Sequence, residues 1–270
     1  MNAPITVTSA AATHIGRRRT LNEDAYLNAA PVFLVADGMG GHEAGECASA
    51  AVMEQFAELQ GRSAVSLDDV RGTLDRARGA VEQITTGGGA RAGTTLSGVV
   101  IASVAGLGYW LCLNIGDSRT YRFANNTLEQ ITVDHSVVQE LIDCGELSAD
   151  QAATDTRRNI ITRSLGAEST EDADYWLFPA EPGDRILICS DGLSGELTAD
   201  QIRTVLTQER DPQQVADILT YQAVEAGGRD NITVVVVDAD SVASPAGAQA
   251  PTSAIDGDTH RREALSGGVR

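Results

Sequence analysis

Short apolar runs that end at or near a turn-forming residue recur between residues 31 and 240. They are rich in branched residues, which is typical of buried strands. These runs are residues 31–37, 95–104, 108–116, 184–190 and 232–240. A further segment, residues 120–133, reads as two strand-like pieces around Asn125 and Asn126 and predicts a hairpin. Antiparallel pairing is therefore expected in at least part of the sheet, which disfavours a purely parallel fold.

Apolar residues spaced three and four apart predict helices between these strands. One apolar helix face recurs over residues 67–84 and follows Ser66, which suits an N-cap. Thr198 and Gln201 have the spacing of a capping box and open a second helix. Residues 211–228 begin with Asp-Pro and end with Gly-Gly, which are start and stop signals of a third. The pattern predicts an α+β protein.

Length and composition favour one folded domain followed by a tail. The chain has 270 residues, 42% of them apolar, which suffices for one large core or two modest ones. From residue 241 onward it consists mostly of Ala, Ser, Gly, Thr and Pro without apolar periodicity. Such composition cannot build a packed core and is typical of disorder. We predict a folded domain over residues 1–240 and a disordered tail over residues 241–270.

The charge balance excludes two classes of partner. With 38 acidic residues against 20 Lys and Arg, the formal net charge is -18, which argues against a nucleic-acid or membrane surface. The four cysteines occur singly, without a CxxC pair, as expected of thiols in a reducing compartment. The first residues lack a basic start followed by an apolar run, and no segment reaches the length of a membrane span. We expect a cytoplasmic protein with neither kind of partner.

Four acidic residues stand at the ends of predicted strands. Asp37, Asp117 and Asp191 each end an apolar run, and Asp230 comes just before residues 232–240. Any one of them alone reads as a turn residue. Strands that lie side by side bring their ends to one edge, where several carboxylates repel one another unless cations bind between them. Oxygen ligands without a Cys or His cluster favour Mg²⁺ or Mn²⁺ over zinc or copper.

Six short motifs follow one another along the chain. They are Arg19-Thr-Leu-Asn22-Glu23-Asp24-Ala25, Asp37-Gly-Met-Gly-Gly-His42, Gly93-Thr94-Thr95-Leu96, Gly116-Asp117-Ser118-Arg119, Ser190-Asp191-Gly192-Leu193 and Asp230-Asn231-Ile232-Thr233. In this order they resemble the PPM/PP2C metal-dependent Ser/Thr phosphatases in their compact bacterial form, over roughly residues 8–238. The resemblance implies a four-layer α/β/β/α sandwich, two antiparallel sheets with helices on both outer faces, as a catalytic domain over residues 1–240.

The resemblance also implies a set of metal ligands. Asp37 would bridge two metal ions, and the carbonyl of Gly38 would be a further ligand, because glycine lets the backbone approach closely. Asp191 and Asp230 would complete the coordination of the second ion. Asp117 would hold a third, weaker ion together with Asp191. The implied cofactors are therefore two Mg²⁺ or Mn²⁺ ions, with a third that binds more weakly.

Three more polar residues would lie behind these ligands. In the family, the residues at the positions of Glu23 and Asp24 act mainly through metal-bound waters and so orient the site. Asn231 is assigned to the same outer layer, and a plain turn residue is its alternative.

Two residues of the motifs would act on the substrate. Arg19 is the candidate phosphate-binding and catalytic clamp, because a guanidinium holds two phosphate oxygens in a fork. Within the arginine run 17–19, only Arg19 has the family's spacing to Glu23. His42 is the candidate general acid for the departing alkoxide. Its alternative is a surface histidine at the start of the helix over residues 43–56.

The implied enzyme is a protein-serine/threonine phosphatase that opposes a bacterial Ser/Thr kinase. A metal-bridging hydroxide would attack phosphorus in line, without a phosphoenzyme. The expected partners are phosphorylated proteins: the kinase, its phosphorylated substrates or a forkhead-associated protein. The protein itself is expected to be a monomer. Two alternatives stay open: a catalytically weak regulatory binding module with the same fold, and a phosphatase of a small phosphorylated metabolite.

One region departs from the family pattern. Residues 136–166 resemble the flap that flanks the active-site cleft, where relatives commonly carry His-Pro a few residues before Asn159. This chain has Asp-Thr-Arg-Arg at residues 155–158. The paired arginines fit recognition of acidic or phosphorylated partners, and equally ordinary surface charge. The departure bears on substrate preference and not on the metal site.

Overall fold

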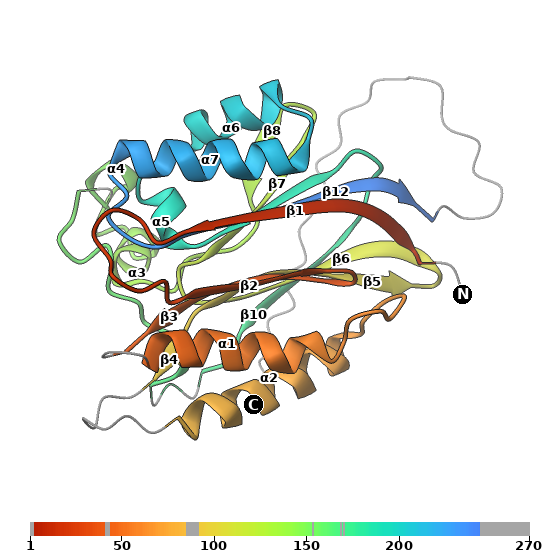
Figure 1. The fold of residues 1–270 in the computed structure, drawn as a ribbon, viewed down its shortest axis with the longest axis horizontal. Helices are drawn as coiled ribbons and strands as arrows, with labels where there is room; N and C mark the ends of the chain where they lie inside the picture. The colour runs from red at the N-terminus through yellow and green to blue at the C-terminus, as the bar shows by residue number, and fades with distance from the viewer. Residues whose placement is uncertain are drawn as a thin grey trace.

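The strand-forming runs assemble into two antiparallel sheets packed face to face, with helices covering both outer faces (Figure 1). The structure is a computed structural model. It describes residues 3–40, 44–84, 92–152, 154–167, 169 and 171–243. The predicted four-layer α/β/β/α sandwich is confirmed.

One sheet has five strands within the described residues. Across the sheet they are β1 (Ile5–His14), β12 (Ile232–Val242), β11 (Arg185–Cys189), β7 (Arg119–Ala124) and β8 (Thr127–Gln130). The predicted hairpin is β7 and β8, joined by Asn125 and Asn126 with φ angles of 50° and 63°. Asparagine tolerates this left-handed conformation better than most residues, which explains the pair at this turn.

The other sheet has seven strands in the described part of the chain. In order they are β10 (Asp174–Pro179), β6 (Leu107–Ile115), β5 (Leu96–Val104), β3 (Val32–Met39), β4 (Gly93–Thr94) and β9 (Leu165–Gly166), with β2 (Asp24–Ala29) paired to β3. Every printed pairing in both sheets is antiparallel. β3 is the central strand, since it pairs with β2, β5 and β4.

Helices cover the outer faces of both sheets, as Figure 1 shows. They are α1 (Ala44–Ala57), α2 (Leu67–Glu82), α3 (Val137–Asp143), α4 (Ala149–Ala152), α5 (Asp191–Ser194), α6 (Ala199–Gln208) and α7 (Pro212–Ala226). α1 and α2 pack on the sheet of β3, while α6 and α7 pack on the sheet of β12. The predicted caps are present, because Ser66 and Thr198 both form capping boxes. Of the described helices, none is long and apolar enough to span a bilayer.

Three apolar layers hold the sandwich together. The middle layer lies between the sheets and contains the fully buried side chains of Trp110 and Phe33. An outer layer joins α1 and α2 to their sheet around Phe56, and the other joins α6 and α7 to theirs around Leu219 and Val234. Because both faces of each sheet are covered, the strands read as nearly continuous apolar runs. This is why they were visible in the sequence.

The folded part extends slightly beyond the boundary expected at residue 240. Ser241 and Val242 belong to β12, because they pair with Thr6 and Ile5 of β1. The rest of the predicted tail, residues 244–270, lies outside the described residues. The division of the chain into a domain and a disordered tail stays a prediction.

Candidate metal centre

Five aspartates from both sheets come together at one edge of the sandwich. Asp24 and Asp37 face each other across β2 and β3. Asp117 and Asp191 follow the ends of β6 and β11, and Asp230 precedes β12. Each of the other four aspartates interacts electrostatically with Asp37. The structure thus assembles the four strand-end acids found in the sequence, together with Asp24.

Burial raises the pKa values of four of these carboxyl groups, those of Asp24, Asp37, Asp117 and Asp191. Burial is the largest cause that raises the pKa of Asp37 well above its ordinary value, and its neighbours raise it further. Burial also raises the pKa of Asp24 to about 7, that of Asp117 to about 8 and that of Asp191 to about 6. Ionising all of them together costs free energy unless positive charge is brought in.

Several oxygens in the cluster fit a hard cation. Glu23 Oε1, Asp24 Oδ1 and Asp191 Oδ1 are buried and, within the described residues, have no hydrogen-bond partner. A buried carboxylate oxygen without a partner is costly, and Mg²⁺ or Mn²⁺ prefers such ligands. Among the described residues no three His, Cys, Asp or Glu side chains already surround one point.

Two glycines allow a close approach beside the cluster. A Cβ atom on Gly38 would lie 2.1 Å from the Gly45 carbonyl oxygen, and one on Gly45 would lie 2.3 Å from Glu23 Oε1. The Gly38 amide donates to the Glu23 carbonyl at 3.1 Å. The end of β3, the start of α1 and Glu23 can therefore meet only because both positions lack side chains. The role of the Gly38 carbonyl as a metal ligand stays a prediction.

Thr94 and Thr95 fix the backbone of Asp37. The Asp37 amide donates to Thr95 Oγ1 at 2.9 Å, and the Thr95 amide donates to the Asp37 carbonyl at 2.9 Å. Thr94 Oγ1 also donates to that carbonyl at 2.9 Å. Both threonines belong to a sequence motif, but no role was predicted for them. Their signal was two adjacent hydroxyl residues, now seen to be buried, at the start of an apolar strand.

Asn231 holds the segment that carries Arg19 and Glu23. Its side-chain oxygen accepts from the Glu23 amide at 2.8 Å. Its side-chain nitrogen donates to the carbonyls of Ile15 and Leu21, both at 2.9 Å. Asn231 is only 3% exposed. A plain turn residue would not make three bonds to a distant segment, so this alternative is not supported.

Arg19 lies at the solvent side of the cluster. Its Nη2 atom is 2.7 Å from Asp230 Oδ2, and about half of the side chain is exposed, at 49%. The hydrogen bond to Asp230 is the largest cause that raises the pKa of Arg19, and Glu23 and Asp37 act in the same direction. An exposed guanidinium beside buried carboxylates can reach an incoming anion. His42 lies outside the described residues.

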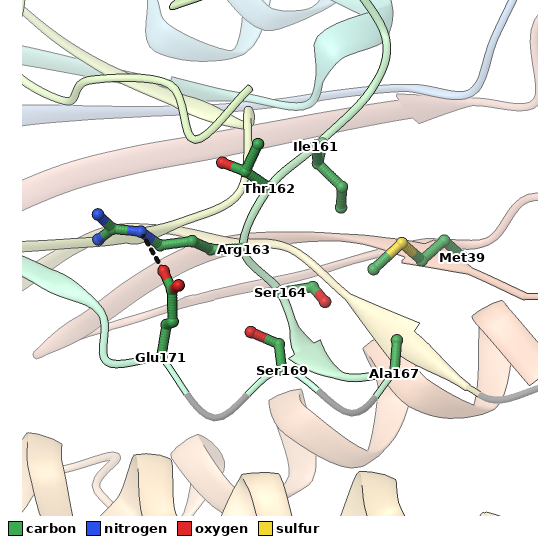
Figure 2. A pocket seen from close by; sticks show the side chains of 8 residues that line it. All are labelled: Met39, Ile161, Thr162, Arg163, Ser164, Ala167, Ser169 and Glu171. Atoms are coloured by element: carbon green, nitrogen blue, oxygen red, sulfur yellow. Dashed lines mark ion pairs between the residues drawn. The ribbon is translucent and has the colours of Figure 1, made fainter. Parts of the chain in front are cut away.

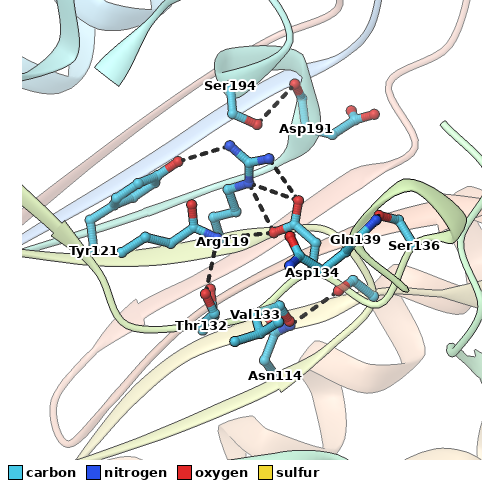
Figure 3. Close-up of polar contacts among 12 residues, drawn as sticks. Asn114, Arg119, Tyr121, Thr132, Val133, Asp134, Ser136, Gln139, Asp191 and Ser194 are labelled. Carbon is cyan, nitrogen blue, oxygen red and sulfur yellow. Dashed lines mark hydrogen bonds and ion pairs between the residues drawn. The ribbon is translucent and has the colours of Figure 1, made fainter. Parts of the chain in front are cut away.

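Arg119 lies behind the cluster, and no role was predicted for it from the sequence. Figure 3 shows its guanidinium between Tyr121 and Asp134. Nε and Nη2 donate to Asp134 at 2.9 and 2.7 Å in a fork. Burial raises the pKa values of Asp117 and Asp191, and the charge of Arg119 partly offsets this. The signal in the sequence was an arginine two residues after Asp117.

Replacing Arg119 with lysine is expected to lower the free energy of unfolding by about 1–3 kcal/mol. Lysine keeps the charge but cannot form the fork, so the mostly buried Asp134 loses part of its hydrogen bonding. Urea unfolding of the metal-free protein measures the difference. The matched control is Arg203→Lys, because Arg203 pairs with Asp200 on an exposed helix surface, where a loss near zero is expected. Equal effects of the two changes would contradict a structural role for the fork.

Comparison with known proteins gives one consistent result. The family model described as Protein phosphatase 2C matches residues 12–223. The "Serine/threonine phosphatase stp" of Listeria welshimeri is 34% identical over 214 residues, which covers 77% of this chain and 84% of that protein.

Solved structures agree with this match. The serine/threonine phosphatase PstP/Ppp of Mycobacterium tuberculosis is similar with a TM-score of 0.79 and 32% identity, covering 87% of this chain and 99% of that one. A structure of the PstP catalytic domain in complex with two manganese ions is similar with a TM-score of 0.73 and 34% identity, covering 86% and 97%.

Proposed function

Because the chain belongs to the protein phosphatase 2C family, we propose that the aspartate cluster at the edge of the sandwich is its catalytic centre. The protein is a protein serine/threonine phosphatase that requires two metal ions. The observation that carries the proposal is the group of buried carboxylates with raised pKa values and unpartnered oxygens. Only bound cations make such a group inexpensive to ionise.

The metal-binding residues that we propose come from the ends of four strands, β3, β6, β11 and β12. Asp37 would hold both ions, together with Asp191 and Asp230 for one of them and the Gly38 carbonyl for the other. Asp117 with Asp191 suits a third, weaker ion. When bound, the ions neutralise phosphate charge and lower the pKa of a water that hydrolyses the ester. Comparing the rates of phosphate release with Mg²⁺ and with Mn²⁺ decides which ion the enzyme prefers.

Residues around the ligands hold the geometry and bind the substrate. Glu23 and Asp24 orient water in the cluster. Arg19, half exposed beside Asp230, binds two oxygens of the phosphate group through its fork. Asn231 keeps the Arg19 segment in place. These groups are preorganised by hydrogen bonds, so little rearrangement is needed when charge develops in the reaction. The role of His42 as a general acid stays a prediction.

The substrates are phosphorylated proteins. A bacterial Ser/Thr kinase, its phosphorylated targets and a forkhead-associated protein stay predicted partners, as does the monomeric state. The binding-module alternative is not favoured, because relatives across the whole match are named as phosphatases.

Phosphate release from a phosphothreonine peptide tests the proposed function. Release is expected with Mn²⁺ or Mg²⁺ and is expected to stop when EDTA is in excess. A sugar phosphate and a nucleotide run in parallel should be hydrolysed with a much lower kcat/KM. Binding of the peptide without hydrolysis under both metals would instead support the binding module, and faster hydrolysis of the sugar phosphate would support a metabolite phosphatase.

A further inference from the structure

A cavity of about 480 Å³ opens beside the candidate metal centre. None of the residues that line it has a role in the proposed function. Figure 2 shows Met39 on one side, and around the cavity the side chains of Ile161, Thr162, Arg163, Ser164, Ala167, Ser169 and Glu171. Its volume falls within the range of about 300–1,000 Å³ that is usual for ligand sites. It exceeds what one side chain fills, so it suits a short stretch of extended chain.

The cavity lies close to the aspartate cluster, where the phosphate group of a substrate would bind. Met39 is two residues after Asp37 on β3, a distance of about 7 Å along a strand. Met39 pairs with Gly93, and Gly93 pairs with Gly166, so a narrow ladder of strands joins the aspartate cluster to β9, which lies between the lining residues Ser164 and Ala167. A peptide with its phosphate at the centre therefore reaches the cavity with the second or third residue from the phosphorylated one.

The lining of the cavity carries no net charge. Arg163 is held by Glu171 at 2.6 Å, the ion pair drawn in Figure 2, and by Asp174 at 3.3 Å. Because its charge is matched, Arg163 does not attract a second phosphate. The other lining groups are hydroxyls, methyl groups and one thioether. Thr162 Oγ1 is buried and, in the described part of the chain, has no hydrogen-bond partner.

One wall of the cavity is fixed to the metal edge through His135. The Gly116 amide donates to His135 Nδ1 at 3.2 Å, so the proton of the neutral ring is on Nε2, which donates to Asp174 Oδ2 at 3.1 Å. The Thr162 amide donates to the His135 carbonyl at 2.8 Å. His135 is 5% exposed. The wall is therefore preorganised, which lowers the entropy cost of binding.

We propose that this cavity binds the substrate chain two or three residues away from the phosphorylated residue and selects uncharged side chains there. The proposal rests on the proposed function, since it places a phosphoprotein across the same edge. The lining hydroxyls can hydrogen-bond a polar neutral group, whereas an unpaired charge would lose its water. A small phosphorylated metabolite does not extend into this cavity, so the cavity favours protein substrates.

Filling the cavity tests the proposal. Ser169→Trp places a large side chain in it, and Ser63→Trp, at an exposed serine between α1 and α2, is the matched control. The readout is kcat/KM for a phosphothreonine peptide with neutral flanking residues, divided by kcat/KM for p-nitrophenyl phosphate. We expect Ser169→Trp to lower this ratio about tenfold and Ser63→Trp to leave it unchanged. Peptides with Asp or Lys at the flanking positions should be about tenfold poorer substrates of the wild type.

A second variant covers the case in which Ser169→Trp does not fold, as judged by thermal unfolding. Ser169→Ala removes one hydroxyl of the lining with little change of shape and is expected to lower the same ratio about fivefold, the effect of one hydrogen bond. If the folded variants keep the wild-type ratio, the cavity does not bind substrate. If the wild type hydrolyses neither substrate, it is the proposed function that fails, and the two failures are thus distinguishable.

Discussion

Replacing Asp37 with asparagine is expected to reduce phosphate release from a phosphothreonine peptide by at least about 10³-fold. Asp37 faces all four other aspartates of the cluster and is the proposed shared ligand. Asparagine has nearly the same shape but no charge, so it cannot neutralise two divalent ions at once. The loss should appear in kcat with p-nitrophenyl phosphate as well, because the small substrate uses the same centre.

The same variant should not lose stability in the absence of metal. Burial raises the pKa of Asp37, so its charge opposes folding when no cation is present. The Asp37→Asn change removes that charge, and thermal unfolding in EDTA is expected at the same temperature as the wild type or higher. The increase in melting temperature that Mn²⁺ gives the wild type should disappear.

Together these measurements separate loss of the site from loss of the fold. Asp217→Asn is the matched control, because Asp217 is exposed on α7 and does not belong to the aspartate cluster. It should keep both turnover and stabilisation by Mn²⁺. Turnover within tenfold of the wild type in Asp37→Asn, with normal stabilisation by Mn²⁺, would rule out Asp37 as the shared ligand.

Most of the strands that the sequence predicted are buried on both faces, and the exception is the partly buried hairpin of β7 and β8, which was predicted from its Asn pair. Residues 184–190 and 232–240 correspond to β11 and β12, whose apolar runs need no knowledge of their neighbours. β1 was not predicted, because Ile5–His14 consists largely of Ala, Thr and Ser and is only partly buried. It becomes a strand because it pairs with β12 along its whole length. Such pairing is tertiary and leaves little local signal.

The residues of the candidate site also divide into those that have a local signal in the sequence and those that do not. The acids at strand ends could be found because each directly follows or precedes an apolar run, and the order of motifs then suggested their roles. The supports could not, since Asp134 and His135 reach Arg119 and Gly116 only once the hairpin of β7 and β8 has formed. Nothing in the local sequence says which carboxylate a buried arginine will meet.

Without metal, the free energy of unfolding is expected to fall as the pH rises from about 4 to about 8. In the folded protein burial raises the pKa of Asp24 to about 7 and that of Asp117 to about 8. Unfolded aspartates release their protons near pH 4, so between these values the unfolded chain binds fewer protons than the folded one. By linkage the stability then decreases with pH, by several kcal/mol in all for the cluster.

Other carboxyl groups change the free energy of unfolding in a lower pH range, so they do not mask the decrease between pH 4 and pH 8. The hydrogen bond from Arg157 lowers the pKa of Asp155 to about 2, and that from His135 lowers the pKa of Asp174. Their stabilisation is present above pH 4 and is lost only as the pH falls further. Urea unfolding in EDTA at pH 5, 6, 7 and 8 therefore reports mainly the aspartate cluster.

Adding Mn²⁺ should reverse the dependence of the free energy of unfolding on pH. Metal ions compete with protons for the carboxylates, so their affinity rises with pH, and the stabilisation that they give grows with affinity. In saturating Mn²⁺ the protein should be more stable at pH 8 than at pH 5. Asp37→Asn should flatten the slope in EDTA and show little response to Mn²⁺. If the wild type in EDTA were as stable at pH 8 as at pH 5, the carboxyl groups of the cluster would not have raised pKa values. The metal ions would then need a different site.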